Sequence, residues 1–227
     1  MKAYIQAKRE AQRHPHKLLQ SKSSAGDILD LALQDAEYGA TASTSELLDQ
    51  LKTFLFAGHD TTAATICWAF YFLSQHSESL SRLRKELDDV FGVNTSPKQV
   101  AEMLIAEPKL HSKLEFALAV IKESLRLEPP AAPAREATAN YRFTTHSGQT
   151  FDPPEGVMMY LSAWMLHRNK DVWGQDAEEF RPQRFMSGNP VPWGYLAFSK
   201  RPRDCIGSSL AYLEVYCNRH RANVRRK

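Results

Sequence analysis

The sequence has few cysteines and no long apolar run, and each shortage excludes a class of protein. Three cysteines occur among 227 residues, at Cys67, Cys205 and Cys217, and their spacing matches no disulfide framework. Such usage is typical of a reducing compartment. The longest largely apolar run, Ala63–Leu73, has 11 residues and is too short to cross a bilayer. Residues 1–13 are polar and basic, unlike a signal peptide.

The chain also lacks a large charge of either sign. Its formal net charge is +3, which gives no case for a nucleic-acid binder. The charge is unevenly spread, because residues 198–227 hold eight Lys or Arg against two Asp or Glu. With 43% hydrophobic and 24% charged residues, the composition predicts a globular fold with a real core.

Hydrophobic periodicity predicts a mainly α-helical protein with a small β region. Ser45 is the expected N-cap of a long helix that runs to about Gln75 and is apolar enough to be central and buried. Further helices are predicted at 1–19, 27–37, 77–91, 96–106, 109–127 and 166–171. After a pair of prolines, short strands are predicted at 135–138, 141–145, 149–152 and 157–162, separated by turn signals.

The middle of the long helix has an unusual composition. Its AGHDTT stretch, Ala57–Thr62, places a glycine, a charge and two threonines where a buried helix favours Leu or Ala. Threonine can bond back to a preceding carbonyl and bend a helix. One interpretation is a tolerated kink. The other is a local widening in which Asp60 supplies a proton and the Thr61 hydroxyl holds water or peroxide.

Two charged segments further along the chain are candidates for a shared network. Glu123 and Arg126 are three residues apart at the end of a predicted helix, so they share a face and can pair. Taken alone, this pair is equally well explained as a surface salt bridge. Arg184, in the FRPQRF stretch, can reach the pair, and three groups of alternating sign favour a buried network.

The FSKRPRDCIG stretch, Phe198–Gly207, holds a cysteine between basic residues and a glycine. Cys205 precedes a helix-like LAYLE run. Positive charge and the N–H groups of a helix N-terminus stabilise a thiolate, and a thiolate can be the axial ligand of a haem iron. The alternative is a small hydrophobic cysteine at the start of a helix.

Four markers occur in a fixed order: AGHDTT, ESLR, FRPQRF and F-x-x-x-x-R-x-C-x-G. Together, over about 45–214, they resemble the cytochrome P-450 family of haem-thiolate monooxygenases, in the style of its eukaryotic members, fungal ones included. The fold that this implies is the C-terminal portion of that family's domain. It would contain a long central helix, an E-x-x-R helix, a short β-sheet and a cysteine loop with its following helix.

The resemblance also implies roles for single residues. Cys205 matches the proximal iron ligand, and Asp60 with Thr61 matches the distal acid–alcohol pair. The family's structural triad is matched by Glu123, Arg126 and Arg184. The partners of the haem propionates are matched by Arg203 and Arg135, and the aromatic ring beside the sulfur is matched by Phe198. His59 and residues 131–134 are expected to face the pocket.

The activity that the resemblance implies is oxidation of a small organic substrate with O₂, and secondary metabolism is the expected setting. The cofactor would be thiolate-ligated haem, and the electron donor an NADPH-dependent cytochrome P-450 reductase. No nucleic-acid partner is expected. The family implies the endoplasmic reticulum membrane, although we expect no anchor in this chain. Without one, a cytoplasmic location is expected.

Three departures from the family pattern qualify this expectation. Lys200 and Arg201 stand where the family usually has glycines, so they either crowd the haem or form a basic proximal face that attracts an acidic reductase. The family-like core is expected at 45–214. A poorly defined helical lead-in, residues 1–44, precedes it, and an atypical basic tail, residues 215–227, follows it. The alternative hypothesis is therefore a truncated or mis-spliced, inactive monooxygenase fragment. A helical interaction module has support only from the amphipathic 77–91 pattern.

Overall fold

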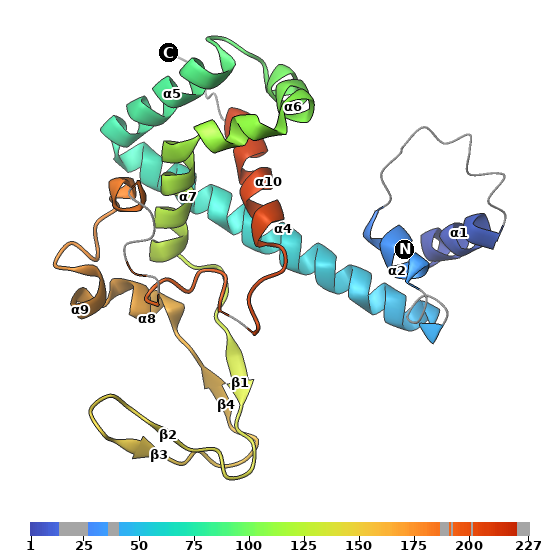
Figure 1. Cartoon of the computed structure of the whole chain (residues 1–227), viewed down its shortest axis with the longest axis vertical. Helices are drawn as coiled ribbons and strands as arrows, with labels where there is room; N and C mark the ends of the chain where they lie inside the picture. The colour runs from blue at the N-terminus through green and yellow to red at the C-terminus, as the bar shows by residue number, and fades with distance from the viewer. Residues whose placement is uncertain (14–26, 36–40, 187–190, 192, 201, 222–227) are drawn as a thin grey trace. The chain divides into compact units, whose positions relative to one another are not determined.

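The structure is a computed structural model that describes residues 1–13, 27–35, 41–186, 191, 193–200 and 202–221. It divides into two compact units, Met1–Asp60 and Thr61–Lys227, which we call the N-terminal and the C-terminal unit. Helices predominate and the sheets are small and antiparallel (Figure 1). The predicted fold class is therefore confirmed. No helix in the described ranges is long and apolar enough to cross a membrane.

The N-terminal unit is built from α1 (Lys2–Arg13), α2 (Ile28–Gln34) and the first part of α4 (Thr44–Gln75). Its core consists of Ile5, Leu29, Leu33, Ala42 and Leu47. An ion pair of 2.5 Å between Lys8 Nζ and Asp30 Oδ2 joins α1 to α2. The rest of the predicted 1–19 and 27–37 helices lies mostly outside the described residues.

Helix α4 begins at Thr44, because its N-cap is Ser43 and not the predicted Ser45. The Glu46 N–H donates to Ser43 Oγ, and Glu46 Oε2 accepts from the Ser43 N–H, which together form a capping box. The helix is continuous through AGHDTT, without the local widening that one of the two interpretations required. Thr65 Oγ1 bonds back to the Thr61 carbonyl at 2.8 Å within regular helix.

The prediction that α4 is central and buried is wrong for residues 52–60, which are all exposed. Phe56, for example, keeps 69% of its surface exposed. Composition alone gave that prediction, because apolar residues surround this part of the helix. Burial depends on which elements pack against those residues, which periodicity does not specify.

Five helical elements pack with the last part of α4 to form the helical core of the C-terminal unit. They are α5 (Ser77–Phe91), α6 (Pro97–Ala106), η2 (Pro108–Lys113), α7 (Glu115–Leu127) and α10 (Ser208–Arg221). Helix α5 has the predicted bounds and ends at Gly92, which has a positive φ of 87°. The predicted 109–127 helix is instead the short 3-10 turn η2 followed by α7.

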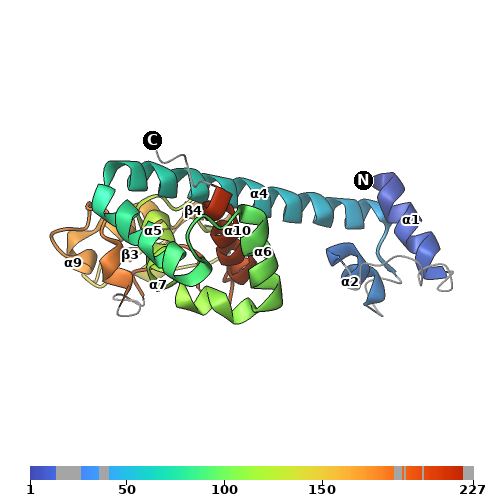
Figure 2. The same ribbon diagram turned by 90° about the horizontal axis from the view of Figure 1, so that it is seen from above.

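Helix α7 is the most buried element of this unit, with ten of its residues buried. In Figure 1 it lies against α5 and α10, and Figure 2 shows α10 beside α6 from a second side. Its N-terminus is capped from α5, because the Glu86 carboxylate accepts from the N–H groups of Phe116 and Ala117 at 2.6 and 2.8 Å. Burial raises the pKa of Glu86.

The β region consists of two separate two-stranded sheets. β1 (Ala134–Glu136) pairs antiparallel with β4 (Met158–Tyr160), and β2 (Phe143–Thr144) pairs with β3 (Thr150–Phe151). β2, β3 and β4 lie within the predicted strands, and β1 begins one residue before the predicted strand at 135–138 and ends two residues earlier. The predicted 166–171 helix is two helices, α8 (Ala163–Arg168) and α9 (Lys170–Trp173), because Asn169 ends the first and caps the second. The last short element before the cysteine stretch is η3 (Pro182–Phe185).

Candidate functional site

Glu123 and Arg126 of α7 form a buried ion pair whose side chains are both 0% exposed. Arg126 Nε lies 2.7 Å from Glu123 Oε2, and Arg126 Nη2 lies 2.9 Å from Glu123 Oε1. The pair is therefore bidentate, the strongest arrangement of arginine and carboxylate. This geometry excludes the alternative of an exposed, weakly stabilising salt bridge.

Arg184 of η3 completes this group, which we call the arginine network (Glu123, Arg126 and Arg184). Arg184 Nε lies 2.9 Å from Glu123 Oε1, and its side chain is 4% exposed. The same carboxylate oxygen accepts from the Arg181 N–H at 2.8 Å. One buried carboxylate on α7 thus fixes the chain around η3.

Arg126 uses all five of its N–H groups. Besides the two bonds to Glu123, it donates to the backbone carbonyls of His167 and Ala177, both at 2.6 Å, and to that of Glu179 at 3.0 Å. The guanidinium also lies over the Trp173 ring, 5.1 Å from its centroid. A buried charge is tolerated when its donors are matched, as they are here.

His167 is a buried residue that the sequence did not single out. It lies at 0% exposure at the end of α8, and its ring stacks on Tyr195 with centroids 5.5 Å apart. Its Nδ1 lies 2.8 Å from the Arg126 carbonyl, and its Nε2 accepts from the Leu196 N–H at 2.8 Å. Burial lowers the pKa of His167 to about 4. A lone histidine in a short helix has no spacing pattern that would reveal these contacts.

The cysteine loop, Leu196–Gly207, is held by backbone hydrogen bonds between residues close in sequence. The Cys205 N–H donates to the Phe198 carbonyl at 2.9 Å, and the Ser199 N–H to the Leu196 carbonyl at 3.0 Å. Ser199 has a φ of 62°, a left-handed conformation that is uncommon for residues other than glycine. The loop leads directly into α10, so Cys205 lies at the start of a helix as predicted.

Side chains in the cysteine loop differ sharply in exposure. The thiol of Cys205 and the guanidinium of Arg203 are exposed, while Phe198 is half-buried against the Tyr212 ring at 5.2 Å. Lys200 Nζ lies over the Trp193 ring, 6.0 Å from its centroid. The backbone of Lys200 is not left-handed, and Arg201 lies outside the described residues.

The other predicted site residues lie on separate elements. Asp60 is exposed on α4, where its Oδ1 lies 2.9 Å from His59 Nδ1, and Thr61 follows it half-buried. Arg135 lies exposed on β1, and its Nη1 donates to the adjacent Ala134 carbonyl at 2.7 Å. The structure thus brings together the arginine network, but not these residues.

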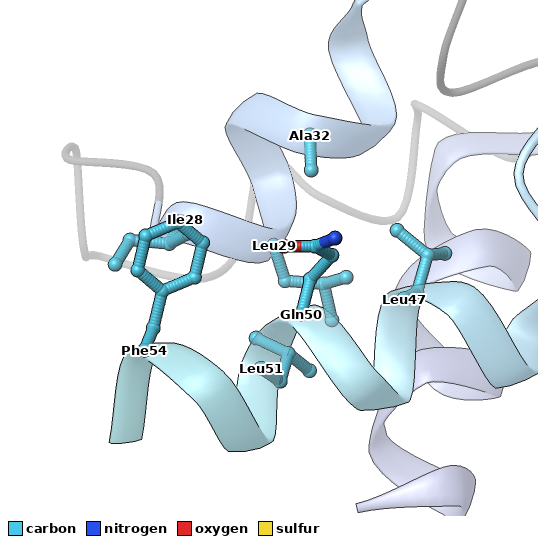
Figure 3. Close-up of a pocket in the computed structure, with 7 residues that line it drawn as sticks. All are labelled: Ile28, Leu29, Ala32, Leu47, Gln50, Leu51 and Phe54. Atoms are coloured by element: carbon cyan, nitrogen blue, oxygen red, sulfur yellow. The ribbon is translucent and has the colours of Figure 1, made fainter. Parts of the chain in front are cut away.

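The N-terminal unit contains an apolar pocket of about 210 Å³ between α2 and α4 (Figure 3). Its lining is formed by Ile28, Leu29, Ala32, Leu47, Gln50, Leu51 and Phe54. Ligand sites are generally larger and carry a few convergent polar groups. Gln50 is the one polar side chain in this lining, so the pocket has no evident chemistry.

Comparisons with known proteins relate the chain to a single family. The sequence model described as cytochrome P-450 matches residues 1–217. The cytochrome P-450 monooxygenase polC of Polytolypa hystricis is 40% identical over 73% of this chain and 30% of its own length. The monooxygenase acrF of Aspergillus aculeatus is 30% identical over 83% of this chain and 43% of its own length. A cytokinin hydroxylase of Arabidopsis thaliana is 31% identical over 86% and 36%.

Proposed function

The chain belongs to the cytochrome P-450 family, and from that premise we propose that it carries the haem-thiolate part of a monooxygenase, with Cys205 as the iron ligand. Proteins of this family generally bind haem and use redox partners and organic substrates. The chain spans less than half the length of the relatives described above, with shares of 30%, 43% and 36%. The activity of a whole enzyme is therefore part of the proposal.

The observation that carries the proposal is that Cys205 has an exposed side chain on a fixed backbone. Its sulfur is exposed, although free cysteine is among the most buried residue types, and its backbone is fixed by the bond to Phe198. One accessible soft ligand at the start of a helix fits a haem iron that takes a single thiolate from the protein.

Two exposed arginines fit the carboxylate groups that such a cofactor carries. Arg203 lies two residues before Cys205, and no described residue pairs with its guanidinium. A charge-assisted bond from Arg203 to a propionate would orient the macrocycle over the sulfur. We assign a second bond of this kind to Arg135, and to Phe198 the shielding of the sulfur from water.

The distal chemistry is assigned to Asp60 and Thr61 on α4. The Asp60 carboxyl would take a proton from solvent, to which it is exposed, and pass it inward. The Thr61 hydroxyl would hold a water molecule beside it. When bound, haem supplies activation of O₂, and the protein supplies ligation, orientation and proton delivery.

The partners follow from the same premise. The relatives named as monooxygenases and as a hydroxylase support insertion of an oxygen atom into a small organic molecule. We propose an NADPH-dependent reductase as the electron donor. Lys200 and Arg203 give the cysteine loop positive charge that would attract an acidic reductase surface. The endoplasmic reticulum membrane is the proposed location.

The test is a haem titration of the purified chain, followed by reduction and addition of CO. The expected result is a Soret band at the position of a thiolate–CO complex, lost in Cys205→Ala. Cys67→Ala is the matched control, since Cys67 is also exposed but lies on α4. Its spectrum should equal that of the unchanged chain. Absence of haem uptake by the unchanged chain would overturn the proposal and favour an inactive fragment.

A further inference from the structure

His167 connects two parts of the C-terminal unit that are far apart in sequence. One ring nitrogen meets the Arg126 carbonyl at the end of α7, and the other meets the Leu196 N–H at the start of the cysteine loop. Both distances are 2.8 Å, and the residue is fully buried. The His167 carbonyl also accepts from Arg126 Nη1 at 2.6 Å. Both the backbone and the side chain of His167 are therefore tied to Arg126.

The two ring contacts fix the tautomer of His167. A backbone N–H can only donate, so Nε2, which faces Leu196, must be unprotonated. A backbone carbonyl can only accept, so Nδ1 carries the hydrogen and donates it to Arg126. The neutral ring therefore satisfies one buried donor and one buried acceptor at once.

From Leu196 the hydrogen bonds continue to the cysteine. The Leu196 carbonyl accepts from Ser199, whose left-handed backbone turns the chain, and the Phe198 carbonyl accepts from the Cys205 N–H. We propose that His167 is a positioning residue, which fixes the cysteine loop to the buried arginine network and thereby sets where Cys205 presents its sulfur. This inference deepens the proposed function and rests on it for the role of the sulfur.

The charges around His167 oppose its protonation. Arg126 of α7 and Arg168 of its own helix are cations that lower its pKa. Glu123 is bound to Arg126 and Arg184, and the Tyr195 hydroxyl, from the segment before the loop, donates to the Lys122 carbonyl at 3.3 Å. A proton on Nε2 would face the Leu196 N–H, donor against donor, and would break the connection to the loop.

The first test uses the unchanged chain without haem. Nitrogen chemical shifts of the His167 ring should show hydrogen on Nδ1 and none on Nε2 near neutral pH. The Leu196 and Cys205 amides should be protected from hydrogen exchange, and their protection should fall together when the His167 ring becomes protonated. Hydrogen on Nε2, or a Cys205 amide that ignores the protonation of His167, would overturn the proposal.

The second test separates positioning from packing with two variants. His167→Gln can place an amide oxygen near the position of Nε2 and accept from Leu196, whereas His167→Phe keeps the stacking on Tyr195 and accepts nothing. Positioning predicts that Gln retains at least half of the haem as the thiolate–CO form, and that Phe loses most of it. The reverse order would indicate packing and overturn the proposal.

His111→Ala is the control for both tests, because His111 is exposed on η2 in the same unit. It should leave the amide protection of Leu196 and Cys205 unchanged. If the unchanged chain takes up no haem, the proposed function fails. The tautomer and the amide protection still decide the role of His167 in that case, so the two failures are distinguishable.

Discussion

The arginine network and the cysteine loop lie in one unit of the chain but differ in burial and in hydrogen bonding. In the network, all five Arg126 donors are paired and the Glu123 and Arg126 side chains have no exposed surface. In the loop, Cys205 and Arg203 are exposed, and the backbone is held by a few short bonds. The difference indicates that the network supplies rigidity, while the loop keeps its reactive groups open.

Removing the centre of the network should have the largest effect. Arg126→Ala leaves Glu123 with one fewer partner and three backbone carbonyls without a donor, so we expect a loss of about 3–5 kcal/mol. Urea unfolding measures it. The control is Arg142→Ala, whose 2.6 Å ion pair with Asp152 is exposed and should contribute about 0–1 kcal/mol. Equal losses in the two variants would contradict a stabilising role for burial.

Acid should weaken the connection between the two regions. Because the pKa of His167 falls from 6.5 to about 4 on folding, the unfolded chain binds the proton first as the pH is lowered. The contribution of neutral His167 to the free energy of unfolding, about 3 kcal/mol, is therefore fully present above pH 6.5. It is lost as the pH falls from 6.5 to about 4. Urea unfolding at a series of pH values measures the loss. In His167→Gln this part of the pH dependence should vanish, and an unchanged profile would refute the assignment.

The cap on α7 should have an intermediate effect. Glu86→Ala removes the acceptor for two N–H groups at the helix start, and we expect a loss of about 1–2 kcal/mol. Thermal unfolding followed by circular dichroism measures it. Glu102→Ala is the matched control, since Glu102 is exposed and lies 3.9 Å from Lys98. A loss in Glu86→Ala no larger than that in the control would show that the cap does not stabilise α7.

The smallest effect on stability should come from the loop itself. Cys205→Ala removes an exposed thiol, so the unfolding free energy of the haem-free chain should change by less than about 0.5 kcal/mol. Unfolding in urea without haem measures it. Haem affinity should fall in the same variant. A large loss of stability would mean that the cysteine serves the core, and would remove the contrast between the two regions.

Local pattern was sufficient for most of the helices but not for every boundary. The 77–91 helix has the predicted bounds because its apolar face and its terminal Gly92 are both local signals. The start of α4 was placed at Ser45, although Ser43 with Glu46 satisfies the capping-box spacing. That signal was present in the sequence.

The site was predictable only where residues form a spaced motif. Glu123 and Arg126 were found from their spacing and Arg184 from its charge, and the structure places the three in contact. His167 was missed because both of its partners are backbone atoms, which have no signature in sequence. The exposure of Phe56 was missed for the related reason that packing partners are not encoded locally.

The bonds of Arg126 to distant carbonyls also set an order of assembly. Its backbone acceptors lie 41, 51 and 53 residues further along the chain, so a growing polypeptide exposes α7 well before the groups that satisfy it exist. Until residues 167–184 have been added, Glu123 and Arg126 have only each other and water. Such late, long-range contacts slow folding, and the unfinished intermediate exposes apolar surface. Chaperones would then bind the exposed apolar side chains of α7 during synthesis.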